Sequence, residues 1–469
     1  MSHTLPLPAV GKSPQTRSSS QLHGVLAALL LQGLAVALAT VYVSGGLSQS
    51  VMTVALLVWG VLALALIALD VRYGLVLFLV SSALSPELQR IAENVKLSDF
   101  VMLLTVLVWG VRCLRAQRLP RLDRPLVLPM VVYTLLSTAM TIIGHTFDYL
   151  VEPQLAPWII LKRLEYLLVF LVVVDTVRTR EWIRLLVFLF VATAAATALY
   201  GMVTQQADIH LAAADVAQTR VVGPAGENPN TLSGFLAIAA AVTLGALLQC
   251  RKPQVTMLLG LALALLLICQ ILTYSREGYL MMAVVFATVG PLWFRVGVLL
   301  LALLAGPMLM PQSARMRLHE TAQMIREVRT GDVGTNSLAF RVQGWRYYWE
   351  RAMRHRPLLG SGVGSSGLGI DNEYILRVME TGVVGLFVFL WLLYSKWGIV
   401  RRLRRLRGDP LARALATGLT GSLLALMLQA LVATSFTTIR TMEPLFFLLG
   451  LGYAVFLIAR RAPRSEAGA

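Results

Sequence analysis

The feature that most constrains this chain is a succession of apolar stretches, each close to the roughly 20 residues that an α-helix needs to cross a bilayer. Short connectors rich in Lys and Arg separate them. Of the 469 residues, 57% are hydrophobic and only 14% are charged. These polar residues are too few to cover a soluble globule of this size, so the net charge of +17 does not indicate a soluble nucleic-acid-binding protein. The stretches are continuous rather than alternating, which excludes a transmembrane β-barrel.

The sequence therefore predicts an all-α, polytopic membrane protein with about 14 transmembrane helices and one large, partly helical loop outside the cytoplasm. The stretch 73–86 is short, and only Arg295 separates two others, which could instead form one long helix. The expected spans are 25–43, 51–69, 73–86, 100–114, 125–144, 158–177, 182–203, 231–249, 255–274, 278–294, 296–311, 376–399, 412–433 and 443–459.

The distribution of Lys and Arg predicts the orientation, because short cytoplasmic loops retain basic residues. With a cytoplasmic N-terminus, cytoplasmic segments hold 24 of the 41 basic residues and six acidic ones, which gives them +18 and leaves the other side −1. This count includes Lys396 as a loop charge. Fusing the spans around Arg295 would put the basic run 401–407 on the wrong side, so we keep fourteen spans and place both termini in the cytoplasm.

This topology divides the chain into five parts. We expect a polar cytoplasmic tail over 1–24, spans 1–11 over 25–311 with an outer loop near 204–230, and a large outer loop over 312–375. Spans 12–14 follow over 376–460, and a cytoplasmic tail over 461–469. The first apolar run lacks a convincing cleavage site and predicts an anchor. In the large loop, apolar residues at three- and four-residue steps predict an amphipathic helix: Leu338, Val342, Trp345, Trp349 and Met353.

Charges at membrane depth are costly and therefore mark candidate functional residues. Lys162, Arg163 and Glu165 lie at the outer end of the sixth span, where a local ion pair is the alternative interpretation. Arg220 precedes a turn-rich loop that enters the next helix. In that loop Asn230 or Thr231 can serve as the helix N-cap, but capping does not explain Arg220.

Two further groups lie on the same side of the predicted membrane. Arg276 and Glu277 form a charged pair in a tight turn, where Arg276 either binds a ligand, pairs with Glu277 or reaches lipid phosphate. The large loop supplies Arg341, and Asp371 closes that loop. Asp371 can be a functional carboxylate or the N-cap of the following helix.

Several kinds of chemistry have no basis in this sequence. The run 362–367 satisfies G-x-G-x-x-G, but no strand precedes it and no βαβ unit surrounds it, so flexible loop glycines are the better interpretation. No Walker lysine motif, His-Glu-x-x-His motif or Cys/His cluster is present in the sequence, and the three cysteines are widely spaced. We therefore expect no metal, no nucleotide and no other cofactor.

Several arginines on one side of the membrane instead suggest an anionic ligand. Guanidinium groups match phosphate in a two-point fork and keep their charge at any relevant pH. The segment 312–377 carries ten arginines against six acidic residues, or +4. A lipid pyrophosphate is the obvious candidate, and a carboxylate beside it can accept a proton from an incoming hydroxyl.

An ordered set of motifs between about 220 and 390 resembles the O-antigen ligase and O-antigen (exopolysaccharide) polymerase superfamily of bacterial membrane glycosyltransferases. The motifs are Asn228-Pro229-Asn230, Thr273-Tyr274-Ser275-Arg276, Arg341-x3-Trp345, Pro357-Leu358-Leu359-Gly360-x-Gly362, and Asp371-Asn372-Glu373-Tyr374-x5-Glu380-Thr381-Gly382-x2-Gly385. The resemblance implies inverting, metal-independent transfer of a glycan from undecaprenyl pyrophosphate to an acceptor hydroxyl, at the periplasmic face of the bacterial inner membrane.

The resemblance also implies roles for individual residues. Arg276 and Arg341 are then catalytic, because they hold the pyrophosphate leaving group, and Asp371 is the catalytic base. The expected substrate-binding residues are Arg220, Arg163, Asn230, Trp345, Asn372, Glu373 and Tyr374.

One departure from the family pattern bears on the reaction. Ligases typically show His-Asn where this chain has Asp371-Asn372, and that His is their proposed base. The difference favours a polymerase, in which the acceptor is a second lipid-linked repeat, over a ligase, in which it is lipid A core. A transporter or flippase for lipid-linked sugar is the alternative from another class. The expected partners are these glycolipids, membrane lipids and a chain-length regulator protein, with no nucleic acid.

Overall fold

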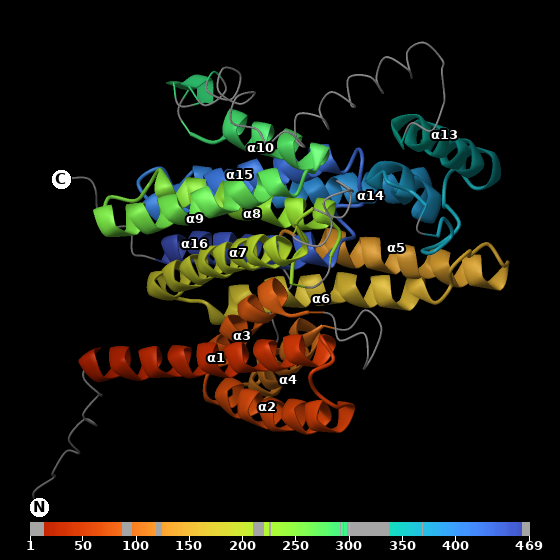
Figure 1. Cartoon of the computed structure of the whole chain (residues 1–469). Helices are drawn as coiled ribbons and strands as arrows, with labels where there is room; N and C mark the ends of the chain where they lie inside the picture. Colours follow the sequence, from red (N-terminus) through yellow and green to blue (C-terminus); the bar gives the residue numbers. More distant parts are fainter. Residues whose placement is uncertain are drawn as a thin grey trace, which may run out of the picture.

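The computed structural model describes residues 14–86, 96–118, 124–209, 220–224, 227–290, 337–367 and 369–461, with isolated residues between 292 and 300. Within these ranges the regular structure is helical, and ten helices are long and apolar enough to cross a membrane (Figure 1). The predicted class, an all-α polytopic membrane protein, is confirmed. Most of the expected span 296–311, the loop segment 312–336, and much of the loop near 204–230 and of both tails lie outside the described residues.

The helices follow one another with short connections. Their bounds are α1 Pro14–Val43, α2 Gln49–Leu69, α3 Val71–Leu84, α4 Leu97–Arg115, α5 Val127–Thr146, α6 Leu155–Thr176, α7 Arg180–Ile209, α8 Pro229–Leu247, α9 Pro253–Leu272, α10 Arg276–Thr288, α13 Ser337–His355, α14 Glu373–Arg404, α15 Pro410–Gln429 and α16 Ile439–Arg461.

The helices differ in how much of their surface contacts other helices. In α8 and α16 78% of the most apolar segment is buried inside the protein, whereas in α2 and α9 only 22% is buried. The exposed faces of such outer helices carry large apolar side chains, among them Leu57, Val61 and Met257. Such surfaces suit contact with lipid tails, since lipid is as apolar as the side chains themselves.

The short helix α3 is an interior element. Eleven of its fourteen residues are buried, and it packs against α1, α2, α4 and α7. Gly74 allows close approach to α4, because a Cβ there would lie 2.3 Å from the hydroxyl of Thr105. A helix enclosed by protein can be shorter than one that must match the lipid thickness on its own, which explains the length of this stretch.

Helix α14 is broken near its beginning, at Gly382, which has a left-handed φ of 68°. The loop before α14 supplies hydrogen-bond partners for the break. Ser361 and Gly362 donate backbone N–H groups to the carbonyls of Met379 and Glu380, each at 2.8 Å. On the other side of the break, the amides of residues 383 and 384 donate to the carbonyls of residues 357 and 358, at 2.8 and 3.2 Å. Residues 357–362 and 379–384, which both belong to the ordered motifs of the sequence, are therefore hydrogen-bonded to each other.

The glycine-rich run 360–367 is held in place, contrary to the expectation of a flexible loop. Its glycines at 360, 362, 364 and 367 have positive φ, which favours glycine. The carbonyl of Gly364 accepts from the amides of Val151 and Glu152, both at 3.1 Å, and the amide of Val363 donates to Thr141 at 3.0 Å. The run thus joins the segment between α5 and α6 to the break in α14.

Helix α13 lies where the spacing of apolar residues predicted an amphipathic helix. It packs on α14 at one end of the bundle (Figure 1). Ala352 is buried in a small apolar cluster with Ile370 and the first turns of α14, and Met353 packs against that cluster. Other residues of the predicted apolar face remain exposed, including Trp349. Trp side chains favour the headgroup level of a membrane, so this exposure is compatible with an interfacial position.

Candidate functional site

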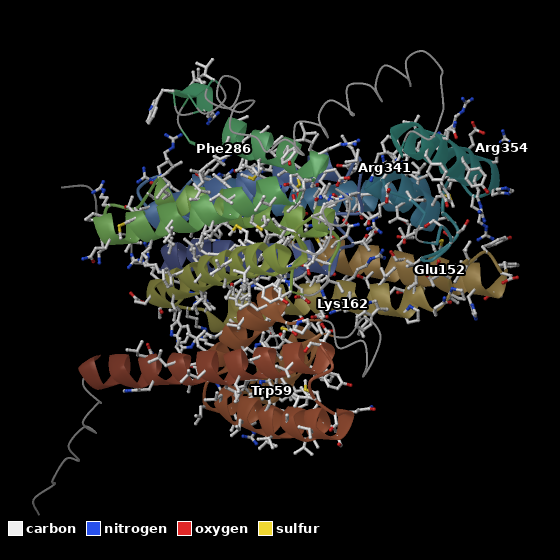
Figure 2. The ribbon with its side chains drawn as sticks, in the orientation of Figure 1. Trp59, Glu152, Lys162, Phe286, Arg341 and Arg354 are labelled. Carbon is white, nitrogen blue, oxygen red and sulfur yellow. The ribbon has the colours of Figure 1, made fainter. Side chains whose placement is uncertain are left out.

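Residues from five separate parts of the chain meet where α8, α10 and α14 begin. Arg341 of α13 links two carboxylates: its Nη1 lies 3.2 Å from Glu277 Oε1, and its Nε lies 3.2 Å from Asp371 Oδ2. We call this group the Glu277 cluster: Glu277, Arg341, Asp371, Asn230, Arg220 and Gln429. Figure 2 shows Arg341 at this end of the bundle, with Arg354 farther along α13.

Amide side chains extend the Glu277 cluster into the protein. Asn230 Nδ2 lies 3.5 Å from Glu277 Oε1, and Gln429 Nε2 lies 3.5 Å from Glu277 Oε2 and 3.2 Å from the carbonyl oxygen of Asn230. Arg220 donates from Nη2 to Asn230 Oδ1 and from Nε to the carbonyl of Thr273, both at 2.9 Å. Two donors of Arg220 are therefore used within the protein, which suits a role in positioning Asn230.

The first turn of α10 holds Glu277 in this position. Ser275 is the N-cap and accepts from the amide of Gly278. Gly278 allows α10 to approach α8 and α9, since a Cβ there would lie 2.2 Å from Ser233 Oγ and from Gln270 Nε2. Arg276, the predicted catalytic arginine, is half-buried at the first position of the helix. An anion is favoured at a helix N-terminus, because unpaired backbone N–H groups and the helix dipole both attract it.

Arg341 and the two carboxylates that it joins differ in exposure. The side chain of Glu277 is 8% exposed, that of Arg341 31%, and that of Asp371 53%. Burial raises the pKa of the Glu277 carboxyl, while Arg341 and Gln429 act in the opposite direction. The cluster therefore runs from a buried carboxylate to an accessible one, with a guanidinium between them.

The predicted helix caps need correction. Asn372, and not Asp371, is the N-cap of α14: its Oδ1 accepts from the amides of Tyr374 and Ile375, at 3.0 and 3.1 Å. Asn228, and not Asn230 or Thr231, caps α8, and Pro229 occupies the first helical position. In both cases the N-cap is the residue directly before the helix, and its backbone is extended or nearly extended. Asp371 and Asn230 are thereby free to take part in the Glu277 cluster.

A second group of arginines and carboxylates lies deeper in the protein, and we call it the Arg377 network: Arg377, Glu373, Glu380, Arg163 and Thr437. Arg377 pairs with Glu373 and, at 2.7 Å, with Glu380. Arg163 lies 3.1 Å from the same oxygen of Glu380. The second oxygen of Glu373 accepts from the amide of Phe436 at 3.0 Å. These four charged side chains are at most 6% exposed.

The remaining predicted site residues divide between the two groups. Glu373 and Arg163 belong to the Arg377 network, Asn372 caps α14, and Tyr374 donates its hydroxyl to the carbonyl of Met427 at 3.0 Å. Trp345 lies one turn after Arg341 on α13, and its buried Nε1 has no hydrogen-bond partner. In this structure, Arg163, Asn372, Glu373 and Tyr374 are bonded within the protein, whereas the side chains of Asp371 and Arg341 are accessible to solvent.

The charges near Lys162 form a separate cluster. Lys162 lies 2.5 Å from Asp99, 2.7 Å from Glu165 and 3.6 Å from Glu443. Three carboxylate oxygens of these residues are close enough together to hold a metal ion, but the Lys162 ammonium group contacts all three. The local pair expected between Lys162 and Glu165 is present, while Arg163 contacts Glu380, 217 positions along the chain.

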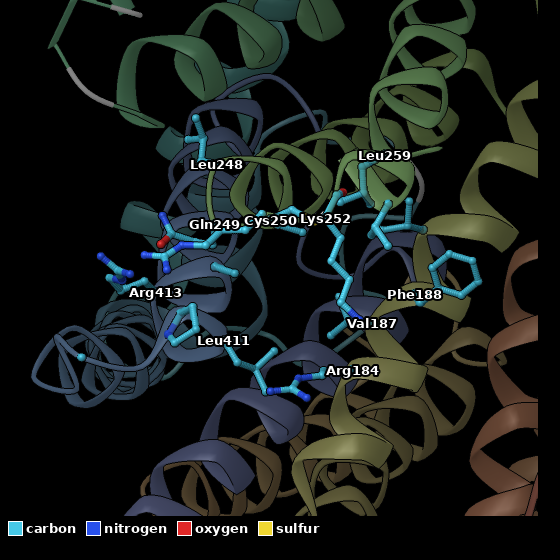
Figure 3. A pocket seen from close by; sticks show the side chains of 17 residues that line it. Arg184, Val187, Phe188, Leu248, Gln249, Cys250, Lys252, Leu259, Leu411 and Arg413 are labelled. Carbon is cyan, nitrogen blue, oxygen red and sulfur yellow. Dashed lines mark hydrogen bonds between the residues drawn. The ribbon is translucent and has the colours of Figure 1, made fainter. Parts of the chain in front are cut away.

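A pocket of about 980 Å³ lies at the opposite end of the bundle (Figure 3). Helices α7 and α9, the loop between α8 and α9, and the start of α15 form its walls. Its lining includes Arg184, Arg251, Lys252 and Arg413 and no acidic residue. A pocket of this composition attracts anions but offers no carboxylate as a general base, so it does not suit the chemistry considered for the Glu277 cluster.

Two parts of this geometry were missed by the sequence analysis. Glu277 was considered only as a neighbour of Arg276, although its position after a Ser N-cap places it in a helix first turn. Lys396 was counted as a loop charge, whereas it is 1% exposed inside α14. Together with Arg377 it shows that charged groups also lie in the interior of the bundle.

Comparison of the sequence with models of known protein families gives no match, and comparison with curated proteins gives none either.

Proposed function

We propose that this chain is a bacterial membrane glycosyltransferase that polymerises lipid-linked oligosaccharide repeats. One observation carries the proposal: Arg341 joins a buried carboxylate, Glu277, to a half-exposed one, Asp371, where the N-termini of three helices meet. This arrangement offers positive charge for a pyrophosphate and an accessible carboxylate beside it. The resemblance of the surrounding motifs to the O-antigen ligase and polymerase superfamily supports the same reaction.

In the proposed reaction, Arg341 and Arg276 bind the pyrophosphate of an undecaprenyl-linked glycan. Asp371 accepts the proton of an acceptor sugar hydroxyl, and the hydroxyl oxygen forms a bond to the anomeric carbon from the face opposite the pyrophosphate. The bond between that carbon and the pyrophosphate oxygen breaks, its electron pair leaves with undecaprenyl pyrophosphate, and the configuration inverts. The arginines stabilise the charge that develops on the departing oxygen.

The other residues of the Glu277 cluster would act indirectly. Glu277 and Gln429 hold Arg341 and Asn230 in position, and Arg220 holds Asn230. We assign Arg163 and Glu373, the predicted substrate-binding residues of the Arg377 network, to the scaffold, since both are buried and ion-paired within that network. The active site lies on the periplasmic side in the proposed topology, with both termini in the cytoplasm.

The alternative of an O-antigen ligase differs only in the acceptor. The purified full chain, given lipid-linked repeats alone, should lengthen them into a ladder of longer lipid-linked glycans. A ligase would leave them unchanged until lipid A core is added and would then transfer glycan to it. A chain that moves the lipid-linked repeats across vesicles but joins them to neither acceptor would be a transporter, and the proposed function would be wrong.

The role of Asp371 has its own test. Replacing Asp371 with Asn keeps the size of the side chain and removes the base, which should lower chain extension by roughly 100- to 10,000-fold. Asp371→His is the informative companion, because imidazole can also accept the proton and should retain more activity than the amide. Because Asn372 and not Asp371 caps α14, both variants should reach the membrane in normal amounts. Full activity with Asn would exclude Asp371 as the base.

A further inference from the structure

A small cavity lies in the interior of the bundle between α5, α6, α14 and α16, with a volume of about 20 Å³. This space is sufficient for one water molecule or one monatomic ion. Tyr166 lines it with a hydroxyl that donates to the carbonyl of Thr437 at 3.5 Å, and four further polar side chains line it among aromatic and aliphatic ones: Arg163, Arg377, Lys396 and Tyr133. None of the four is more than 5% exposed, so bulk water does not solvate them.

These four side chains bring unused hydrogen-bond donors to the cavity. Arg163 Nη1, Arg377 Nε and the hydroxyl of Tyr133 are buried and have no hydrogen-bond partner. The ammonium group of Lys396 makes no ion pair in the part of the chain that the structure describes, and it lies 4.6 and 4.9 Å from the ring centroids of Phe436 and Phe446. A buried donor without an acceptor is costly, and several around one cavity call for a shared acceptor.

The carboxylates of the Arg377 network do not fill this role. Glu380 contacts Arg377 Nη1 and Arg163 Nη2 through one oxygen, and Glu373 contacts Arg377, Phe436 and Thr437. Neither carboxylate is among the residues that line the cavity. Three cations and two carboxylates leave this region with a formal charge of +1. The three acids around Lys162 do not line the cavity either.

We propose that this cavity binds one small monovalent anion of the halide class, such as chloride. The anion would accept from Arg163, Arg377, Lys396 and Tyr133 at once and would bring the formal charge of the region to zero. A water molecule would meet mainly donors here and would find few acceptors for its own hydrogens. Phosphate, sulfate and carboxylates exceed the available volume. Because the donors come from α5, α6 and α14, the bound anion would tie these helices together.

The test uses the purified full chain in detergent, with chloride replaced by gluconate at constant ionic strength. The midpoint of thermal unfolding should rise with chloride and reach a plateau, and bromide should act as chloride does. In Lys396→Met the midpoint should no longer depend on chloride. The matched control Arg354→Met replaces an exposed cation on α13, away from the cavity, and should keep the dependence.

A second variant covers the case in which Lys396→Met does not fold. Tyr133→Phe removes one donor and keeps the ring, so the chloride concentration at half-effect should rise roughly tenfold. A structure determined in bromide should show the heavier ion in the cavity. The proposal is wrong if the midpoint is the same in all anions, if Lys396→Met or Tyr133→Phe leaves the chloride dependence unchanged, or if the cavity holds only water.

Discussion

The Glu277 cluster and the Arg377 network consist of the same side-chain types but differ in their exposure to solvent. Asp371 belongs to the first and Glu373 to the second, and only the cap residue Asn372 separates them. The side chain of Asp371 is 53% exposed, whereas that of Glu373 is fully buried and accepts from three groups. Ion pairing alone therefore does not mark a site. What distinguishes the Glu277 cluster is that Arg341 is accessible and pairs with both a buried and an exposed carboxylate.

The comparison predicts its largest effect on folding at Arg377. Arg377→Ala would leave the carboxylates of Glu373 and Glu380 buried without their main partner, and breaking a buried pair in this way costs about 3–5 kcal/mol. We expect a strong loss of folded protein in the membrane, measured by fluorescence-detected gel filtration of a tagged chain. Arg354→Ala, on the exposed face of α13, should behave as the wild type does. Normal amounts of folded Arg377→Ala protein would show that the network is not a scaffold.

A smaller loss of stability is expected at the break in α14. Gly382 has a positive φ, and a Cβ there would lie 2.2 Å from the backbone of Leu358. Gly382→Ala should therefore destabilise the chain by about 1–3 kcal/mol, seen as a lower thermal midpoint. The matched control is Gly398→Ala in the same helix, where a Cβ would meet no atom within 4 Å. Equal midpoints for the two variants would contradict the interlocking of residues 357–362 with the break.

The smallest effect concerns the pH dependence of activity. Burial raises the pKa of Glu277, so its pair with Arg341 should be lost at a higher pH than for an exposed glutamate. Chain extension should therefore decline on the acid side with a midpoint above the usual value of about 4.5. Glu277→Gln should move this decline to lower pH, and Glu350→Gln on α13 should leave it in place.

The raised pKa of Glu277 also affects the stability of the fold. Because the folded-state pKa of Glu277 is raised, its ionisation opposes folding above that pKa, and this penalty disappears as the pH falls through it. Glu277→Gln should consequently cost little stability at neutral pH, unlike Arg377→Ala. An acid limb that persists unchanged in Glu277→Gln would assign it to another group.

The sequence predicted the fold class because continuous apolar stretches of membrane length can be recognised directly along the chain. It also placed Arg341 and Asp371 on one side of the membrane, since both follow from the order of spans. It could not pair Arg341 with Glu277 or Arg163 with Glu380, because such contacts depend on which helices are neighbours. The cap assignments were wrong by one to three residues, at Asn372 and Asn228, since Asp, Asn and Thr are all favoured N-cap residues.

Lys396 illustrates a different limit. It lies five positions before the Arg-rich run that begins at Arg401, so the sequence placed it with the loop charges. Helix α14 in fact continues to Arg404, and Lys396 lies on the face of this helix that is buried in the bundle. Which face of a long helix is buried depends on the neighbouring helices α15 and α16, and the local sequence does not contain that information.

The central claim is that the Glu277 cluster binds and activates a lipid-linked pyrophosphate, and Arg341 is the residue that tests it most directly. The rate of chain extension from lipid-linked repeats should be measured for Arg341→Ala and for Arg354→Ala, each normalised to the amount of folded protein in the membrane. We predict a loss of roughly 100- to 1,000-fold for Arg341→Ala, as for other groups that stabilise a developing negative charge, and no loss for Arg354→Ala. Equal rates in the two variants would contradict the account.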